Sequence, residues 1–385
     1  MHFLTPSKIR TAPHPSPLPA KPGRGGRTAW CFVAALFAVL LCIPTSVPAA
    51  DPSEREPMDD AIDKGLEYLQ SSQATDGSWG AGRSGSRDPA ITALCVMAFM
   101  SAGHVPGEGK YGKLIENGVR FVMKSQLDNG LFAAPSRGSY EMYYHGICTL
   151  MMAEVAGMTS PELSQPVRDR LKKAVDVVLQ GQRKTGNDRG GWRYTVQGYD
   201  ADISVTGWQL MALRAAKNVG CDIPAERITD AVGYIRRCYD SSSGGFRYMQ
   251  SGWGVTIPCT GTSILALELC GKEFHRAPEL LKAGGYILRN PMTPTQTHFS
   301  YGIYYTSQAM FQLGDNYWKS YRPVLHRLVL RDNAPRANGA WVGRAPDDQM
   351  FGPNYCTAMA ILALTVEYRF LPIYQRGDEA SEEGK

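Results

Sequence analysis

The sequence predicts an all-α fold, an (α/α)6 toroid in which about six helical hairpins close into a ring. A glycine-aromatic turn recurs about every 50 residues along the chain. Each turn follows a segment with amphipathic helical periodicity, and an apolar segment rich in small residues begins roughly ten residues after it. An open solenoid is the alternative, but about six units is the number that closes a ring.

Residues 1–50 have the layout of a secretory signal. Five basic side chains and no acidic one precede an apolar run at 29–43, which is about fifteen residues long and too short to span a membrane. We expect cleavage near Ala49 or Ala50, and hence a secreted or periplasmic protein. The alternative is an uncleaved N-terminal membrane anchor.

The remaining chain divides into a toroid at residues 51–370 and a polar tail at 371–385, which we expect to be disordered. The formal net charge is +5 and the leader carries five cations, so the mature chain is close to neutral. This excludes a basic footprint for nucleic acid.

The cysteines after the leader include no CxxC pair, and we expect them to be reduced packing residues. A bridge between Cys221 and Cys238 stays open.

An aromatic residue, usually with a glycine before it, marks the turn of each unit. The aromatic positions are Trp79, Phe132, Trp192, Phe246, Phe299 and Trp341. The fifth, at Phe299, is the weakest match because no glycine precedes it. Glycine at the others supplies the positive φ that a tight hairpin turn needs.

The helices on the two sides of each turn differ in character. Residues 171–179 before the third turn have one charged and one apolar face, whereas residues 263–269 after the fourth are apolar nearly all round. A helix that is apolar on every side must be covered on every side, so the apolar helices form an inner ring inside the amphipathic ones. The predicted inner helices span 88–102, 143–156, 202–215, 257–270, 304–313 and 355–366.

The first turn has the motif Gln73-x3-Gly77-x-Trp79, and Gln126 begins a second near match. This pattern resembles the QW repeat of squalene and oxidosqualene cyclases. Over residues 57–370 the chain looks like a single-toroid, exported member of the terpene cyclase and prenyltransferase superfamily. In that family these residues tie one outer helix to its neighbour, so the resemblance implies that Gln73, Gln126 and Trp79 are structural.

The chemistry that the resemblance implies centres on Asp202. Proton-initiated cyclases carry a DxDD motif whose central Asp is the general acid, and here Asp200 and Asp202 match its first and central positions while Ile203 replaces the last. Such an acid must stay protonated beside an apolar cavity. In the rival interpretation Asp202 is only the N-cap of its helix, which would lower its pKa. Both interpretations stay open, and with them the question of enzyme activity.

The zinc site of the prenyltransferase branch is not formed. That branch has Asp-x-Cys on one inner helix and a His at the start of the next, whereas here Ser204 stands in the thiolate position and the next helix begins at Ile257 without a His. We expect no metal and no cofactor. Family cyclases enclose substrate between two toroids, so a protein partner or a dimer would have to close this single one.

Aromatic and histidine side chains at or near the inner-helix starts are the candidate ligand-binding residues, because aromatic faces bind apolar chains or stabilise cations. They are Tyr144, His145, Trp208, Trp253, Tyr305 and Tyr355. Packing at the ring mouth is the alternative for each. Arg193 and Arg247, which directly follow their turns, would brace the rim or meet an acidic head group.

Two functions follow from these patterns. In the first, the lumen holds an apolar, isoprenoid-like or lipid ligand, with Asp202 and Asp200 in proton-initiated cyclase or isomerase chemistry. In the second, the ring is a non-catalytic scaffold or interaction module, for which a filled lumen and an ion-paired Asp202 would speak. A third possibility is a carbohydrate-active enzyme, which would need paired carboxylates in a polar cleft, and only Asp200 and Asp202 are obvious candidates.

Overall fold

The computed structural model describes residues 56–82, 86–133 and 140–375, all within one compact unit, Asp51–Lys385. The expected signal peptide lies outside these residues. Among the described helices, none is both long enough and apolar enough to cross a membrane.

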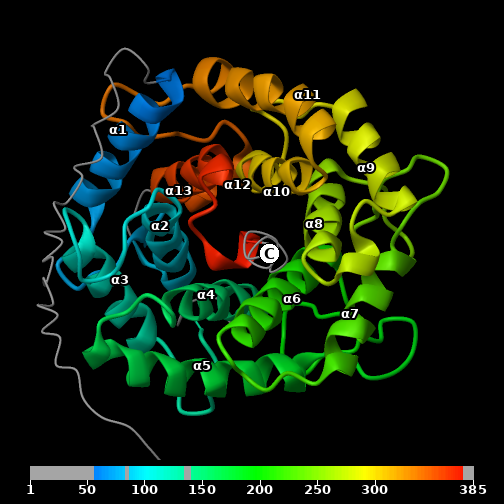
Figure 1. The fold of residues 1–385 in the computed structure, drawn as a ribbon, viewed down its shortest axis with the longest axis horizontal. Helices are drawn as coiled ribbons and strands as arrows, with labels where there is room; N and C mark the ends of the chain where they lie inside the picture. The colour runs from blue at the N-terminus through cyan, green and yellow to red at the C-terminus, as the bar shows by residue number, and fades with distance from the viewer. Residues whose placement is uncertain (1–55, 83–85, 134–139, 376–385) are drawn as a thin grey trace, which may run out of the picture. The chain divides into compact units, whose positions relative to one another are not determined.

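Six described helices form an inner ring (Figure 1). They are α2 (Pro89–Ser101), α4 (Glu141–Val155), α6 (Ile203–Asn218), α8 (Ile257–Glu268), α10 (Phe299–Gln312) and α13 (Pro353–Leu364). Each packs against the next, and α13 packs against α2, so the ring is closed. The predicted α/α toroid is therefore confirmed.

A second set of helices surrounds the ring (Figure 1). They are α1 (Pro57–Ser72), α3 (Gly112–Lys124), α5 (Pro161–Gly181), α7 (Ala225–Arg237), α9 (Pro278–Arg289) and α11 (Asp315–His326). Helix α11 contains Pro323, which lacks an N–H, and it continues as a π-helix, η3 (Arg327–Asp332). The short elements are β1 (Gly80–Ala81), β2 (Ser86–Arg87), η2 (Lys272–Phe274), α12 (Pro346–Phe351), η4 (Thr365–Tyr368) and η5 (Pro372–Tyr374).

Burial follows the predicted difference between the two rings. Every residue of α2 and of α8 is buried, whereas α3 buries only the face that carries Ile115, Val119 and Val122. The expected cap of α2 is also present, because Asp88 accepts hydrogen bonds from the N–H groups of Ala90 and Ile91 at 2.9 and 3.0 Å.

In five turns a glycine with positive φ lies against the backbone of the next outer helix. These glycines are Gly77, Gly130, Gly190, Gly244 and Gly339. A Cβ on Gly339 would collide with the carbonyl of Lys64 in α1. The last turn is thus packed directly on the first outer helix, which seals the ring.

The fifth unit departs from the prediction. Helix α10 starts at Phe299 rather than at residue 304, and Phe299 is its first residue, not part of a glycine turn. His298 before it has a φ of 64°, and its N–H donates to the Asp347 carboxylate at 3.0 Å. In this unit the hydrogen bond from His298 to Asp347 of α12 therefore takes the place of the glycine turn.

The end of the chain and the cysteines complete the fold. All seven cysteines after the leader are free, so no bridge joins Cys221 to Cys238.

We expected the packed ring to end at residue 370, but Leu371, Ile373 and Tyr374 are at most 5% exposed. Figure 1 shows this last segment, in red, running into the middle of the ring. Residues 376–385 lie outside the described chain.

Candidate functional site

Recurring hydrogen bonds attach five of the six inner helices to their turns. The N–H of Trp192 donates to Thr206 Oγ1 at 3.0 Å, and its indole Nε1 donates to the carbonyl of Val178 at 2.7 Å. Trp79 and Trp341 make the same pair of bonds in their units. The starts of the inner helices, with the turns that hold them, form one end of the ring, which we call the turn rim.

Asp202, the predicted general acid, lies at this rim with no exposed surface. Its Oδ1 accepts from Val205 N–H at 2.8 Å and from Ser204 Oγ at 2.7 Å, and its Oδ2 accepts from the Tyr248 hydroxyl at 2.9 Å. Burial raises the pKa of Asp202 above its ordinary value, although these bonds and Arg193 act in the opposite direction. Both carboxylate oxygens accept hydrogen bonds, and the bond from Val205 N–H to Oδ1 is that of an N-cap.

Arg193 joins the two predicted acids. Its Nη1 pairs with the Asp200 carboxylate, and its Nε lies 3.3 Å from Asp202 Oδ2. The Asp200 side chain is 32% exposed, so the cluster reaches the surface there. Arg247 makes a similar pair with Asp240, at 2.8 Å. Both arginines thus pair with acidic side chains at the rim, and these contacts correspond to the bracing role.

Both imidazole nitrogens of His145 make hydrogen bonds within the protein. Its Nδ1 accepts from the Phe132 N–H at 3.1 Å, and its Nε2 donates to the carbonyl of Ala174 in α5 at 2.9 Å. It thus replaces the threonine found in other units and adds a tie to the next outer helix. Burial lowers the pKa of His145 to about 4, so its imidazole is neutral at physiological pH.

Tyr144 and Tyr355 are packed into the rim. The Tyr144 hydroxyl donates to Asp88 Oδ2 at 3.2 Å, and the Tyr355 ring lies 5.0 Å from that of Phe351. Both are less than a tenth exposed. Packing, the alternative that the sequence left open, describes their contacts.

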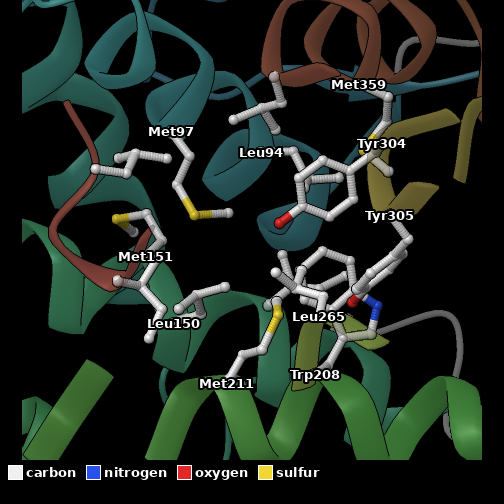
Figure 2. Close-up of a cluster of buried hydrophobic side chains, with 14 of the residues drawn as sticks. Leu94, Met97, Leu150, Met151, Trp208, Met211, Leu265, Tyr304, Tyr305 and Met359 are labelled. Atoms are coloured by element: carbon white, nitrogen blue, oxygen red, sulfur yellow. The ribbon is translucent and has the colours of Figure 1, made fainter. Parts of the chain in front are cut away.

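Trp208 and Tyr305 lie in the lumen of the ring. Figure 2 shows their side chains and others, from all six inner helices, pointing toward one another. Trp208 stacks on Tyr304 with ring centroids 5.8 Å apart. A ligand-sized hollow would leave its lining side chains exposed, but none of the residues labelled in Figure 2 is more than 2% exposed. The lumen is therefore packed with side chains.

Residues 369–375, which we call the C-terminal segment, close the lumen at the end opposite to the turn rim. The Tyr374 hydroxyl bonds that of Tyr304, and Gln312 Nε2 donates to the Tyr374 carbonyl at 3.2 Å. The N–H of Ile373 donates to Glu154 Oε2 at 3.1 Å. A cavity beside the segment, lined in part by Gln308 and Tyr374, has room for roughly one water molecule.

Sequence reasoning missed Glu154, because a single acid near the end of an apolar helix has no motif. It is 2% exposed, and burial raises the pKa of Glu154 to about 8. The carboxyl group is therefore mostly protonated at neutral pH. It holds the C-terminal segment as a neutral hydrogen-bond acceptor.

A second pair of carboxyls at the rim was also missed. Asp348 Oδ2 accepts from the Ser300 N–H and hydroxyl at 3.2 and 2.8 Å, and Asp347 pairs with His298 at 2.8 Å. Burial raises the pKa of Asp348 to about 6. The pair caps the start of α10 from outside, and the adjacent Asp-Asp at the start of α12 was its only sequence signal. Within the described residues, no group of three or more His, Cys, Asp or Glu is arranged to hold a metal ion.

Comparison with known proteins gives a weak relative in sequence. No protein-family model matches the chain. A squalene–hopene cyclase of Bradyrhizobium diazoefficiens is 27% identical over 192 residues, which cover 43% of this chain and 27% of that cyclase. The chain thus spans about a quarter of the length of the curated relative it matches.

Solved structures of three kinds of enzyme share the fold. The α-1,6-mannanase GH76A of Salegentibacter sp. HEL1_6 has a TM-score of 0.61 at 11% identity and covers 81% of this chain and 99% of its own. Cellobiose 2-epimerase from Bacillus thermoamylovorans has a TM-score of 0.60 at 11% identity, covering 81% and 99%. The type II terpene cyclase MstE from Scytonema has 0.52 at 14%, covering 82% and 98%. These likenesses show the α/α-toroid fold, and the fold alone does not identify the chemistry.

Proposed function

We propose that this chain is a non-catalytic α/α toroid that works as a scaffold or interaction module. The packed lumen carries the proposal, because side chains and the C-terminal segment occupy the space in which a cyclase would hold its substrate. The hydrogen bonds of Asp202 support it as well. A proton donor to an alkene needs an O–H directed into a dry cavity, whereas both Asp202 oxygens accept bonds from the protein.

Product analysis tests this proposal. The purified protein is incubated with squalene and with geranylgeranyl diphosphate, beside an Asp202→Asn variant, and the extracts are analysed by gas chromatography with mass spectrometry. We expect no product from either protein. A cyclised product that forms with the wild type and is lost in Asp202→Asn would contradict the proposal.

A cyclase or isomerase with an apolar ligand is the second candidate. The methionine and aromatic side chains of the lumen, among them Met97, Met151 and Tyr304, favour it. Withdrawal of the C-terminal segment, whose Tyr374 bonds Tyr304, would open the lumen at that end. Similarity to a squalene–hopene cyclase supports it too, as does the fold shared with MstE, which has been solved with a geranylgeranyl dihydroxybenzoate substrate. In this candidate Asp202, with Asp200, supplies the proton.

Export and partner binding belong to the same proposal. The basic leader and apolar run at residues 1–43 support export, and the turn rim is the end of the ring that a partner or second copy would cover. Intact mass measurement of the protein from an expressing cell tests export, with a mature chain beginning near Asp51 as the expected result. A full-length chain that stays with the membrane fraction would instead indicate an anchor.

A further inference from the structure

A row of four aromatic rings lies on the turn rim. It consists of Tyr140, Tyr194, Tyr248 and Trp253, and we call it the aromatic row. The rings of Tyr140 and Tyr194 are 4.8 Å apart and those of Tyr248 and Trp253 are 5.3 Å apart, measured between centroids. A 2.8 Å hydrogen bond between the hydroxyls of Tyr194 and Tyr248 joins the two halves.

The two ends of the row face solvent. Tyr140 is 48% exposed and Trp253 is 57% exposed, whereas the aromatic residues of the turns, such as Trp79 and Trp192, are fully buried. Large aromatic side chains gathered on a surface mark binding sites more often than single exposed ones do. The exposed rings add nothing to the packing of the core, so a ligand is the better explanation of their position.

The inner rings of the row are held rigidly from behind. The carbonyls of Tyr194 and Tyr248 accept backbone bonds from Met142 and Ile203, both at 2.9 Å. The guanidinium of Arg193 lies 4.8 Å from the Tyr194 ring, and the Tyr248 hydroxyl donates to buried Asp202. A site ordered in advance loses little side-chain entropy when a ligand binds. The cluster around Asp202 therefore acts as the support of a surface rather than as a reaction centre.

The chemistry of the row selects its ligand. Its ring faces are apolar, its middle carries two phenol hydroxyls, and the partly exposed Asp200 carboxylate lies beside it. The hydroxyls bond each other and Asp200 pairs with Arg193, but their oxygens keep acceptor lone pairs, which an apolar lipid would cover without bonding. An anion would meet an arginine that Asp200 already neutralises. A sugar ring has an apolar C–H face and a rim of hydroxyls, which matches both features.

We propose that the aromatic row binds a neutral oligosaccharide. Its sugar rings stack on Tyr140 and Trp253, and its hydroxyls bond to the hydroxyls of Tyr194 and Tyr248 and to Asp200. Successive rings along the row suit a chain of linked sugars better than a single one. Such binding involves no bond breaking, so it is independent of whether the lumen is catalytic.

Isothermal titration calorimetry with cellohexaose, xylohexaose and mannohexaose tests the proposal. We expect at least one of them to bind the wild type, and Tyr140→Ala and Trp253→Ala each to weaken that binding by roughly tenfold. Tyr199→Ala is the matched control, because Tyr199 is 91% exposed on the same rim and lies outside the row. Its affinity should stay within about twofold of the wild type.

Three results would overturn the proposal. One is that none of the hexasaccharides binds protein whose thermal unfolding shows it to be folded. Another is that both row variants bind as tightly as the wild type. The third is that a proline-rich peptide binds the row and the sugars do not, since aromatic surfaces also accept polyproline helices. Lipid products from the lumen would bear on the proposed function and leave this one unaffected.

Discussion

Buried carboxyl groups show how much a single residue's role depends on its partners. Asp202 has the hydrogen bonds of an N-cap, as one interpretation of the sequence had it, but its pKa is raised rather than lowered, because burial outweighs those bonds. The sequence could place Asp202 at a helix start. It could not reveal how completely neighbouring turns exclude water from that position.

Glu154 gives a prediction about pH. Its folded pKa of about 8 lies above the ordinary value of 4.5, so its contribution to stability is full below about pH 4.5 and is lost as the pH rises through 8. Glu154→Gln cannot ionise and keeps an acceptor for the Ile373 N–H. We expect the variant to gain roughly 4 kcal/mol over the wild type between pH 4.5 and 8.5, measured by urea unfolding.

The control for Glu154→Gln is Glu162→Gln, which removes an exposed carboxylate from α5. A gain of the same size in both variants, or a gain that does not grow with pH, would show that Glu154 is not ionising in a buried site.

His145 gives the opposite pH dependence. Its folded pKa of about 4 lies below the ordinary 6.5, so stability is lost as the pH falls from 6.5 toward 4. His145→Thr keeps an acceptor for Phe132 but loses the bond to Ala174, which we expect to cost roughly 1–3 kcal/mol at pH 7. The deficit should shrink by about 2 kcal/mol at pH 4.5 in urea unfolding. An equal deficit at both pH values would exclude a buried, neutral His145.

At the scale of elements, the repeat determines most of what the sequence could predict. Gln73 and Gln126 do tie their turns to the next outer helix, through bonds of 2.9 Å to the carbonyls of Leu114 and Arg170. Gln182 does the same at 2.8 Å to Arg227, but its turn is longer and hides the motif. Spacing in the sequence identifies a repeat only while the turn length stays constant, whereas the hydrogen bond depends on the final geometry.

The turn glycines give a prediction at this scale. In Gly190→Ala the new Cβ would collide with the Asp230 carbonyl of α7, in addition to the strain at a φ of +93°. We expect a loss of roughly 3 kcal/mol or more in chemical unfolding. Gly186→Ala is the control, since it has a φ of +72° and open space around it, and should lose about 1 kcal/mol. Equal losses would mean that the turn does not depend on close contact with the next helix.

At the scale of the whole molecule, the packing of the lumen depends on all six repeats together. Six inner helices that begin some 50 residues apart meet in one lumen, so whether that lumen is hollow depends on the sizes of side chains that are distant in sequence. The C-terminal segment is equally hard to foresee, because seven residues after the last inner helix carry no periodicity. Its place in the lumen depends on hydrogen bonds to Glu154, near the end of α4, and to Tyr304 and Gln312 of α10.

Native mass spectrometry of the full chain after incubation with squalene tests the packed lumen most directly. With the labelled lumen residues at most 2% exposed and the C-terminal segment in place, we predict the mass of the protein alone. A variant that ends at Tyr368 and is shown to be folded serves as the comparison, because it lacks the segment that closes the lumen. A one-to-one squalene adduct on the wild type would contradict the account.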